Sequence, residues 1–264
     1  MPIIHDDAIL LKIGGSLLSR QVHLHRFCSE LLEITSKLRL RVYIMTGGGA
    51  RARKLREDYR ETLLEDSKDD LYHWKAIGTM DENAADLYDL FQNISTNSDD
   101  LNVKLQLTSE PNPNSDRKSC ISIIKPSPIL KMKDELPHSW AVTSDSIAYW
   151  FLQIISTCCV ILVKDVPFLT VNSQPVRDLS VKRLDQLMRH SEYKFRIEEH
   201  LGKGTQFPVD PHLPDLMGKI GIPVLILNGL VPSTLKSVLN HIKNDSIDGL
   251  SQYGTLIRKK EIYS

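Results

Sequence analysis

Short apolar runs that end in glycine clusters are the feature that most limits how this chain can fold. The runs at residues 8–13 and 42–45 have the length and composition of buried strands, and a segment with helical spacing, residues 22–38, lies between them. The glycines that follow the two runs are Gly14 and Gly15, and then Gly47, Gly48 and Gly49. Strands that alternate with helices predict an α/β fold, a three-layer αβα sandwich with a mainly parallel central sheet.

The same alternation continues through the rest of the chain. Further strands are predicted at residues 103–107, 120–124, 159–163, 224–227 and 254–257. Helices are predicted at residues 50–64, 71–91, 143–156, 181–189, 211–220 and 232–242, with an interruption of the second one near Gly78. No repeat or linker divides the sequence, so we expect a single domain over residues 1–264. One lobe extends to about residue 135 and a second covers about 136–264.

Composition and charge argue against several classes of protein. The 264 residues carry 33 Lys and Arg against 33 Asp and Glu, so the formal net charge is zero and lacks the basic surplus of a nucleic-acid binder. The four cysteines have no C-x-x-C spacing, which argues against a zinc site and favours reduced thiols. The first residues do not resemble a signal peptide, and no apolar run is long enough to cross a bilayer. We therefore expect a cytoplasmic protein with no nucleic-acid or membrane partner.

The two glycine clusters mark a place where an anion can bind. In a parallel sheet both lie at the carboxyl edge, where ligands bind. Glycines leave backbone N–H groups uncovered, and the helices that follow direct their positive ends at the same region. Lys12, two residues before Gly14, places an ammonium group over this edge, as phosphoryl transfer requires. Neither cluster fits a Walker A or G-x-G-x-x-G pattern, and the alternative is that the glycines only make tight turns.

Four motifs occur along the chain in a characteristic order. They are Lys12-x-Gly-Gly-Ser, Thr46-Gly-Gly-Gly, Thr143-Ser-Asp-Ser-Ile-Ala and Leu162-Val-Lys-Asp-Val. This order resembles the amino-acid kinase superfamily, which includes acetylglutamate kinase, bacterial uridylate kinase and isopentenyl phosphate kinase. Val209-Asp210, residues 223–228 and residues 254–257 resemble the closing elements of the uridylate-kinase branch, so the likeness covers nearly the whole chain.

A narrower resemblance rests on two segments. Residues 139–145 and 73–77 look most like the aminomethylfuran phosphate kinases of methanofuran biosynthesis. The same region is also similar to molybdenum storage proteins, which bind ATP and oxyanions on this fold. Both resemblances imply a small-molecule partner that carries phosphate or another oxyanion.

The resemblance implies a role for each matching residue. Lys12 and Asp145 are expected to be catalytic, with Lys12 neutralising charge on the transferring phosphoryl group and Asp145 orienting the lysines. ATP is the implied cofactor, with Mg²⁺ bridging its phosphates and no direct protein ligand to the metal. The residues expected to bind ATP are Gly14, Gly15, Ser16, Lys164 and Asp165, the last two at the base and ribose. The residues expected to hold the acceptor are Gly47, Gly48, Gly49 and Arg51. The first lobe is then the acceptor side and the second the nucleotide side.

Several of these residues also have a plainer interpretation. Asp145 lies in the predicted first turn of a helix, where the helix dipole alone favours a carboxylate by roughly 0.3–1 kcal/mol. Lys164 fits a surface lysine at a strand end equally well. Arg51 and Arg53 fit either a grip on an acceptor phosphate or a solvated helix face. Trp140 fits a core position or a lid.

The sequence departs from the family pattern after the nucleotide strand. The usual Asp-Gly-(Val/Ile)-Tyr is replaced by Pro167-Phe168-Leu169, which is one residue shorter. Several members carry a second catalytic lysine after this strand. Here only Lys203, between Gly202 and Gly204, lies in a comparable stretch, and it also fits an ordinary loop lysine.

The leading hypothesis is an ATP-dependent small-molecule kinase that phosphorylates a phosphomonoester such as an aminomethylfuran phosphate. One alternative is a nucleotide- or oxyanion-binding or storage protein with a degenerate kinase site. Another is a uridylate-type kinase. A homo-oligomer is expected, because superfamily members usually assemble in this way.

Overall fold

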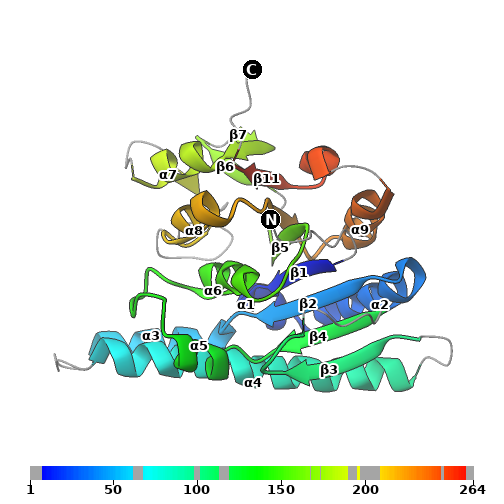
Figure 1. Ribbon diagram of the computed structural model, residues 1–264, viewed down its shortest axis with the longest axis horizontal. Helices are drawn as coiled ribbons and strands as arrows, with labels where there is room; N and C mark the ends of the chain where they lie inside the picture. Colours follow the sequence, from blue (N-terminus) through cyan, green and yellow to red (C-terminus); the bar gives the residue numbers. More distant parts are fainter. Residues whose placement is uncertain are drawn as a thin grey trace.

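Most of the chain is organised around one large β-sheet. The computed structural model describes residues 8–61, 68–97, 102–112, 119–166, 168–172, 174–189, 195–196, 209–244 and 247–259. Within them, eight strands form a sheet in the order β3-β4-β2-β1-β5-β10-β11-β8 (Figure 1). The strands are β1 (Ala8–Ile13), β2 (Arg41–Thr46), β3 (Lys104–Thr108), β4 (Cys120–Ile124), β5 (Cys159–Lys164), β8 (Asp178–Ser180), β10 (Val224–Asn228) and β11 (Thr255–Arg258).

The sheet is mainly parallel, as the sequence predicts. All neighbouring pairs are parallel except β10 and β11, which are antiparallel. The most apolar strand, β5, lies between β1 and β10 in the interior of the sheet. This arrangement confirms the predicted α/β fold.

Helices cover both faces of the sheet, and the side-chain alternation of the strands separates two cores. The helices are α1 (Gly15–Leu18), α2 (Gln21–Leu38), α3 (Gly49–Glu61), α4 (Lys68–Thr96), α5 (Ser127–Lys133), α6 (Ser144–Trp150), α7 (Val181–Arg189), α8 (Leu213–Ile220) and α9 (Thr234–Asn244), with 3₁₀ turns η1 (Phe151–Gln153) and η2 (Ile247–Gln252). Side chains of α2 and α9 fill one core, and those of α5 to α8 fill the other. Helix α4 contributes to both cores.

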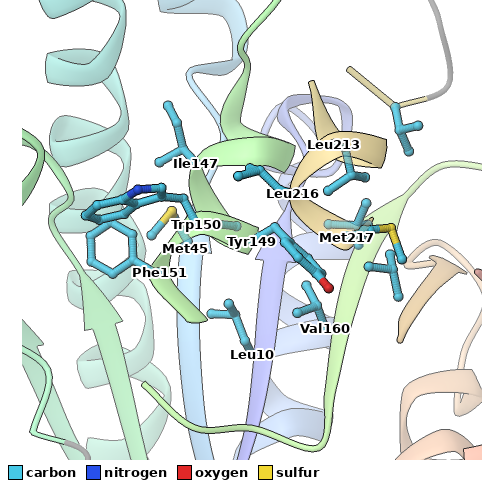
Figure 2. Close-up of a cluster of buried hydrophobic side chains, with 14 of the residues drawn as sticks. Leu10, Met45, Ile147, Tyr149, Trp150, Phe151, Val160, Leu213, Leu216 and Met217 are labelled. Carbon is cyan, nitrogen blue, oxygen red and sulfur yellow. The ribbon is translucent and has the colours of Figure 1, made fainter. Parts of the chain in front are cut away.

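The core beneath α6 matters most for the site. Figure 2 shows Tyr149, Trp150 and Phe151 packed with Leu10 of β1 and Val160 of β5, and all five are fully or almost fully buried. The Tyr149 hydroxyl donates a hydrogen bond to the carbonyl of Ile222, 2.7 Å away, so its polar end is satisfied. Large aromatic side chains in this position fix α6 against the sheet.

Two predicted helix boundaries were wrong. Helix α4 runs without a break through Gly78. A glycine costs about 1 kcal/mol in a helix, but the neighbours Ile77 and Met80 are buried in the core and hold the helix together. The helix predicted at 143–156 ends as α6 at Trp150 and continues only as the turn η1. The apolar run continues past this end because the turn residues are still in the core, and apolar content alone does not mark where a helix stops.

A small second sheet was not predicted. It contains β6 (Leu169–Val171), β7 (Gln174–Val176) and β9 (Phe195–Arg196) in the order β7-β6-β9. Its strands have two or three residues each, which is too short for a hydrophobic period to show in the sequence. The Thr255 hydroxyl accepts a hydrogen bond from the Leu169 N–H at 2.8 Å, which links this sheet to the large one.

The cysteines agree with the expectation of reduced thiols. All four, Cys28, Cys120, Cys158 and Cys159, are free and buried. Among the described residues, no helix has both the length and the apolar character needed to cross a bilayer.

Candidate functional site

Two lysines reach the same face of the sheet at its carboxyl edge. Lys12 shares one side of β1 with Leu10, and Lys164 shares one side of β5 with Leu162, and both leucines belong to the core beneath α6. Lys12 pairs with Leu162 across the two parallel strands, so Lys164 lies two residues farther along. Alternation and register together therefore direct both ammonium groups toward the first turn of α6, where Asp145 lies.

Asp145 binds both lysines at once. Lys12 Nζ lies 2.8 Å from Oδ1, and the Lys164 ammonium donates a hydrogen bond to Oδ2 at 2.9 Å. The three side chains expose only 7%, 13% and 5% of their surface for Lys12, Lys164 and Asp145, so water screens these contacts weakly. We call these three residues the Asp145 cluster; its formal charge is one positive unit.

The cluster shifts the pKa of its members. Burial alone would raise the pKa of Asp145, but the charges of Lys12 and Lys164 outweigh it and hold that pKa well below its usual range. Burial lowers the pKa of Lys12, and Lys164 acts in the same direction, although Asp145 opposes them. Asp145 is therefore a carboxylate that does not take up a proton near neutral pH, and it is a poor general base.

A second buried carboxylate, Asp210, fixes the helix that carries Asp145. Asp210 Oδ2 accepts hydrogen bonds from the N–H and hydroxyl of Thr143, both at 2.9 Å, and from the N–H of Ser146 at 2.8 Å. Oδ1 accepts from the Ser146 hydroxyl and from the N–H groups of His212 (3.1 Å) and Leu213 (3.0 Å) at the start of α8. Two helices therefore begin at one carboxylate.

The two glycine turns touch each other beside this cluster. We call Gly14 and Gly15 the first glycine turn, and Gly47, Gly48 and Gly49 the second. A Cβ atom on Gly15 would lie 2.5 Å from Gly49 Cα, closer than any real contact allows. A Cβ atom on Gly47 would lie 3.5 Å from Lys12 Nζ and 3.1 Å from Ser144 Oγ. The second turn therefore passes directly under the Lys12 ammonium, and only glycines fit where the turns meet.

The backbone donors of the turns divide into two groups. The N–H groups of Gly14 and Gly47 extend the sheet, because they donate to Val163 O at 2.9 Å and Ile13 O at 2.8 Å. The N–H groups of Gly15, Ser16, Gly48 and Gly49 donate to no acceptor in the described part of the chain. These groups lie at the starts of α1 and α3, so they can bind an anion.

Helix α4 holds the second glycine turn in place. The Asn83 side chain donates to Gly47 O at 2.7 Å, and the Thr46 hydroxyl donates to Met80 O at 2.8 Å. Arg51, which the sequence assigns to the acceptor, bonds to Asn83 Oδ1 and forms ion pairs with Glu82 (3.0 Å) and Asp86 (2.9 Å). Its charge is already neutralised by α4, so binding of the acceptor by Arg51 stays a prediction.

The structure brings some predicted residues together and leaves others apart. Lys12, Asp145 and both glycine turns meet at one place, and Ser16 lies beside them in α1. Lys164 was assigned to the nucleotide's base and ribose, but its ammonium group lies on Asp145. Asp165 follows β5 and has no side-chain partner among the described residues. Lys203 and Pro167 lie outside the described residues.

Four residues of the site were missed or given no role. Ser144, Asn83 and Thr79 line the second glycine turn, and Asp210 anchors α6. The sequence signals Asp210 through Val209-Asp210, which resembles a closing element of the family, but that resemblance gave Asp210 no role. Asn83 carries no signal, because it is one of several polar residues on a long amphipathic helix.

The fold and the site together define an α/β protein in which two glycine turns with free N–H groups lie beside two largely buried ammonium groups, an arrangement suited to phosphate groups. The profile of the amino acid kinase family matches residues 7–228, and the chain belongs to this family. Members of the family are ATP-dependent phosphotransferases, and the protein is a kinase of this class.

The known proteins similar to the chain include uridylate kinases. The uridylate kinase of Methanococcoides burtonii is 24% identical over 254 residues, which cover 94% of this chain and 98% of that protein. The solved uridylate kinase of Archaeoglobus fulgidus superposes with a TM-score of 0.60 at 15% identity, covering 94% of this chain and 99% of the other. The UMP kinase of Bacillus anthracis gives a TM-score of 0.59 at 15% identity, with 97% of each chain covered. The structural likeness confirms the fold.

Proposed function

We propose that the protein transfers the γ-phosphoryl group of ATP to a phosphomonoester and releases a diphosphate product and ADP. The observation that carries this proposal is the Asp145 cluster, in which one carboxylate holds Lys12 and Lys164 beside the second glycine turn. Phosphoryl transfer spreads negative charge over several oxygens, and catalysis consists mainly of positioning and charge stabilisation. Two ammonium groups and a set of free N–H groups match that need.

The chemistry of the cluster also favours a particular acceptor. In the transfer, an acceptor oxygen forms a bond to the γ-phosphorus while the bond to the bridging oxygen of ADP breaks. An alcohol acceptor needs a base to remove its proton, but the pKa of Asp145 is held far too low for that task. A phosphomonoester, whose second pKa is about 6, is already an anion at neutral pH. It can attack without a base, and the lysines then offset the charge of both reactants.

The residues of the site divide into two sides under this proposal. The N–H groups of Gly15 and Ser16 bind the ATP phosphates, and those of Gly48 and Gly49 bind the acceptor phosphate. Lys164 acts as the second lysine of the transfer, in place of a lysine from the loop around Lys203. The lobe of residues 1 to about 135 is then the acceptor side, and the lobe of residues about 136–264 is the nucleotide side.

We propose that Mg²⁺ enters with ATP. The described residues contain no group of three or more His, Cys, Asp or Glu side chains that could hold a metal ion by themselves. Magnesium is commonly bound through substrate phosphates and water with few protein ligands. When bound, it would neutralise part of the charge on the phosphates.

The test is an ADP-release assay with ATP, Mg²⁺ and a panel of phosphomonoesters. UMP belongs in the panel because the similar proteins are uridylate and UMP kinases, and an aminomethylfuran phosphate belongs there because of residues 73–77 and 139–145. Release of ADP that depends on one ester supports the proposal. A Lys12→Ala variant should lose at least about a thousandfold in kcat, and full activity of this variant would refute the mechanism.

A second candidate function is the binding or storage of a nucleotide or oxyanion by a family member whose kinase site is degenerate. It is favoured by the replacement of the usual Asp-Gly segment by Pro167-Phe168-Leu169. Calorimetry distinguishes the two: tight binding of ATP with no transfer to any ester in the panel supports the binding protein. We also propose that the chain forms a homo-oligomer, and light scattering that gives a particle of 30.0 kDa would contradict this.

A further inference from the structure

A cleft lies between α3 and the loop that precedes α6, away from the Asp145 cluster. It is lined by Arg56, Tyr59, Arg60 and Trp140, and we call it the Trp140 cleft. The guanidinium carbon of Arg56 lies 4.8 Å from the centre of the Trp140 ring, and the Tyr59 and Trp140 rings meet edge to face with their centres 5.5 Å apart. The cleft therefore presents aromatic rings and guanidinium groups to the same space.

The arginines of this region have no ionic partner among the residues that the structure describes; a carboxylate at the cleft, that of Asp69, accepts a hydrogen bond from the Tyr59 hydroxyl at 2.5 Å. Arg53, Arg56 and Arg60 are spaced three and four residues apart, so they lie on one face of α3 together with Gly49. None of the three forms an ion pair with any residue that the structure describes. Burial and the charge of Arg60 both lower the pKa of Arg56. An anion in the cleft would relieve this repulsion.

The same face of α3 leads from the cleft to the second glycine turn. Arg56 lies seven residues after Gly49, roughly 10 Å along the helix axis, and helical side chains lean toward the N-terminus, which shortens the gap. Trp140 lies three residues before Thr143, which Asp210 fixes at the start of α6. A molecule whose phosphate sits at the second glycine turn would extend along this face into the Trp140 cleft.

We propose that the Trp140 cleft binds the end of the acceptor that does not react, and that this end is a planar ring carrying a second negative group, such as a carboxylate. The inference rests on the proposed kinase function. The ring packs against Trp140 and Tyr59, and the negative group binds Arg56 and Arg60, whose planar guanidinium groups suit a carboxylate. A single phosphate at the glycine turn does not account for Arg56 and Arg60, because they lie two and three helical turns from Gly49.

The size of the cleft narrows the ligand further. The cleft is open to solvent and offers about 230 Å³, which is below the roughly 300–1,000 Å³ of pockets that hold drug-sized ligands. This space accommodates one ring with its substituent. Two consequences follow: the cleft does not select a base together with its sugar, and a positively charged substituent on the ring is repelled by the arginines.

The experiment compares three synthetic acceptors that differ only in charge. They are 4-carboxybenzyl phosphate, benzyl phosphate and 4-(aminomethyl)benzyl phosphate. With ATP and the full chain, kcat/KM should fall by about tenfold at each step in this order, because charge-assisted hydrogen bonds to the carboxylate are gained and then replaced by repulsion. The double variant Arg56→Gln, Arg60→Gln should reduce the preference for the carboxylate to within about twofold. Trp140→Leu should lower kcat/KM for the two preferred esters by about tenfold.

A matched control lies on the same helix. Lys54→Gln removes one exposed positive charge from a different face of α3, so it should preserve the order of the three esters. Thermal unfolding followed by circular dichroism shows whether each variant is folded. If Arg56→Gln, Arg60→Gln does not fold, Arg60→Gln alone, at an exposed position, carries the test.

The outcomes separate this inference from the kinase proposal. Equal kcat/KM for the three esters, or the reverse order, overturns the proposal that the Trp140 cleft binds the acceptor, and it leaves the kinase proposal intact. If neither these three esters nor any ester of the wider panel is phosphorylated, the proposal of transfer to a phosphomonoester fails, and calorimetric binding of the three esters then tests the Trp140 cleft. Binding in the stated order, weakened by the arginine variants, supports it. Equal affinities or no binding overturn it.

Discussion

Cationic side chains gather in two places, the Asp145 cluster beside the second glycine turn and the Trp140 cleft farther along α3, and they are held in different ways. In the Asp145 cluster, Lys12 is buried, Lys164 is mostly buried, and the two share one carboxylate. In the Trp140 cleft, Arg56 is half-buried, Arg60 is exposed, and neither has an ionic partner among the described residues. Buried charges must be paired within the protein, because desolvation is costly. Partly exposed charges stay hydrated until a ligand binds. We therefore expect the Asp145 cluster to act in the reaction and the Trp140 cleft to select the acceptor.

The largest expected effect on stability comes from breaking the Asp145 cluster. Asp145→Asn leaves the buried ammonium group of Lys12 and the mostly buried one of Lys164 without a counter-charge, so the free energy of unfolding should fall by about 3 kcal/mol. Urea denaturation at pH 7 measures it. Asp165→Asn is the matched control, because Asp165 also lies at the end of β5 but has no partner in the described structure; its effect should stay within about 0.5 kcal/mol. Similar losses in both variants would mean that the ion pairs contribute little.

The next effect tests which lysine completes the transfer site. Lys164→Met should lower kcat by about a hundredfold in the ADP-release assay, because one of the two ammonium groups near the transferring phosphoryl group is lost. Lys125→Met, at a lysine that follows another parallel strand, β4, should leave kcat within about twofold. If Lys203→Met is damaging and Lys164→Met is not, the second lysine comes from the loop and the assignment of Lys164 is wrong.

The dependence of kcat on pH tests the coupling between Lys12 and Asp145 within the cluster. Lys12 must be protonated to offset charge, and burial lowers its pKa below the ordinary value of about 10.4. Activity should therefore fall as the pH rises through the lowered pKa of Lys12. Asp145 raises the pKa of Lys12, so in Asp145→Asn the fall should move to lower pH. A profile of kcat between pH 6 and 10 shows it; an unchanged or higher midpoint in the variant would contradict the coupling.

The contribution of Asp145 to stability should decrease at acid pH. The pKa of Asp145 is lower in the folded chain than in the unfolded chain, because the two ammonium groups outweigh the effect of burial. Its contribution is therefore fully present above the unfolded value of about 3.9 and is lost as the pH falls through the folded value. Urea denaturation below pH 4 should show the difference between wild type and Asp145→Asn becoming smaller than at pH 7.

The smallest effect is expected at the Trp140 cleft. Arg56→Gln should change the free energy of unfolding by no more than about 0.5 kcal/mol, because the lost contact with Trp140 is offset by the lost repulsion from Arg60. Arg258→Gln provides the comparison, since Arg258 forms ion pairs with Asp178 (2.9 Å) and Asp248. That variant should lose about 1 kcal/mol. A larger loss for Arg56→Gln would show that the cleft is structural.

Much of the fold could be predicted because the strands and helices have strong hydrophobic periods. The apolar run of β5 and the spacing of α2 leave little choice of structure. Helix α4 and the small second sheet show the limits of this approach. A glycine suggests a break, but buried neighbours outweigh its cost, and strands of two or three residues are fixed by tertiary contacts that no local pattern contains.

The site was predictable where it depends on strand alternation and not where it depends on contacts between distant segments. Lys12 follows from its position at the end of a strand. The position of Lys164 follows only once β5 is known to pair with β1, because the register then places the two ammonium groups on one face. The sequence cannot show that Arg51 turns toward Glu82 and Asp86 while Arg56 faces Trp140, since both are arginines on one charged helix.

The shared carboxylate of Asp210 limits which substitutions relatives of this chain can tolerate during evolution. Thr143 at the N-cap of α6, Ser146 within α6, and the start of α8 all bond to it. Loss of Asp210 alone would leave several buried donors unpaired at once, each at a cost of about 1–3 kcal/mol. In relatives of this chain, the acid and its two hydroxyl partners should therefore be kept together or replaced together, and an alignment in which they vary independently would show that α6 is held by other means.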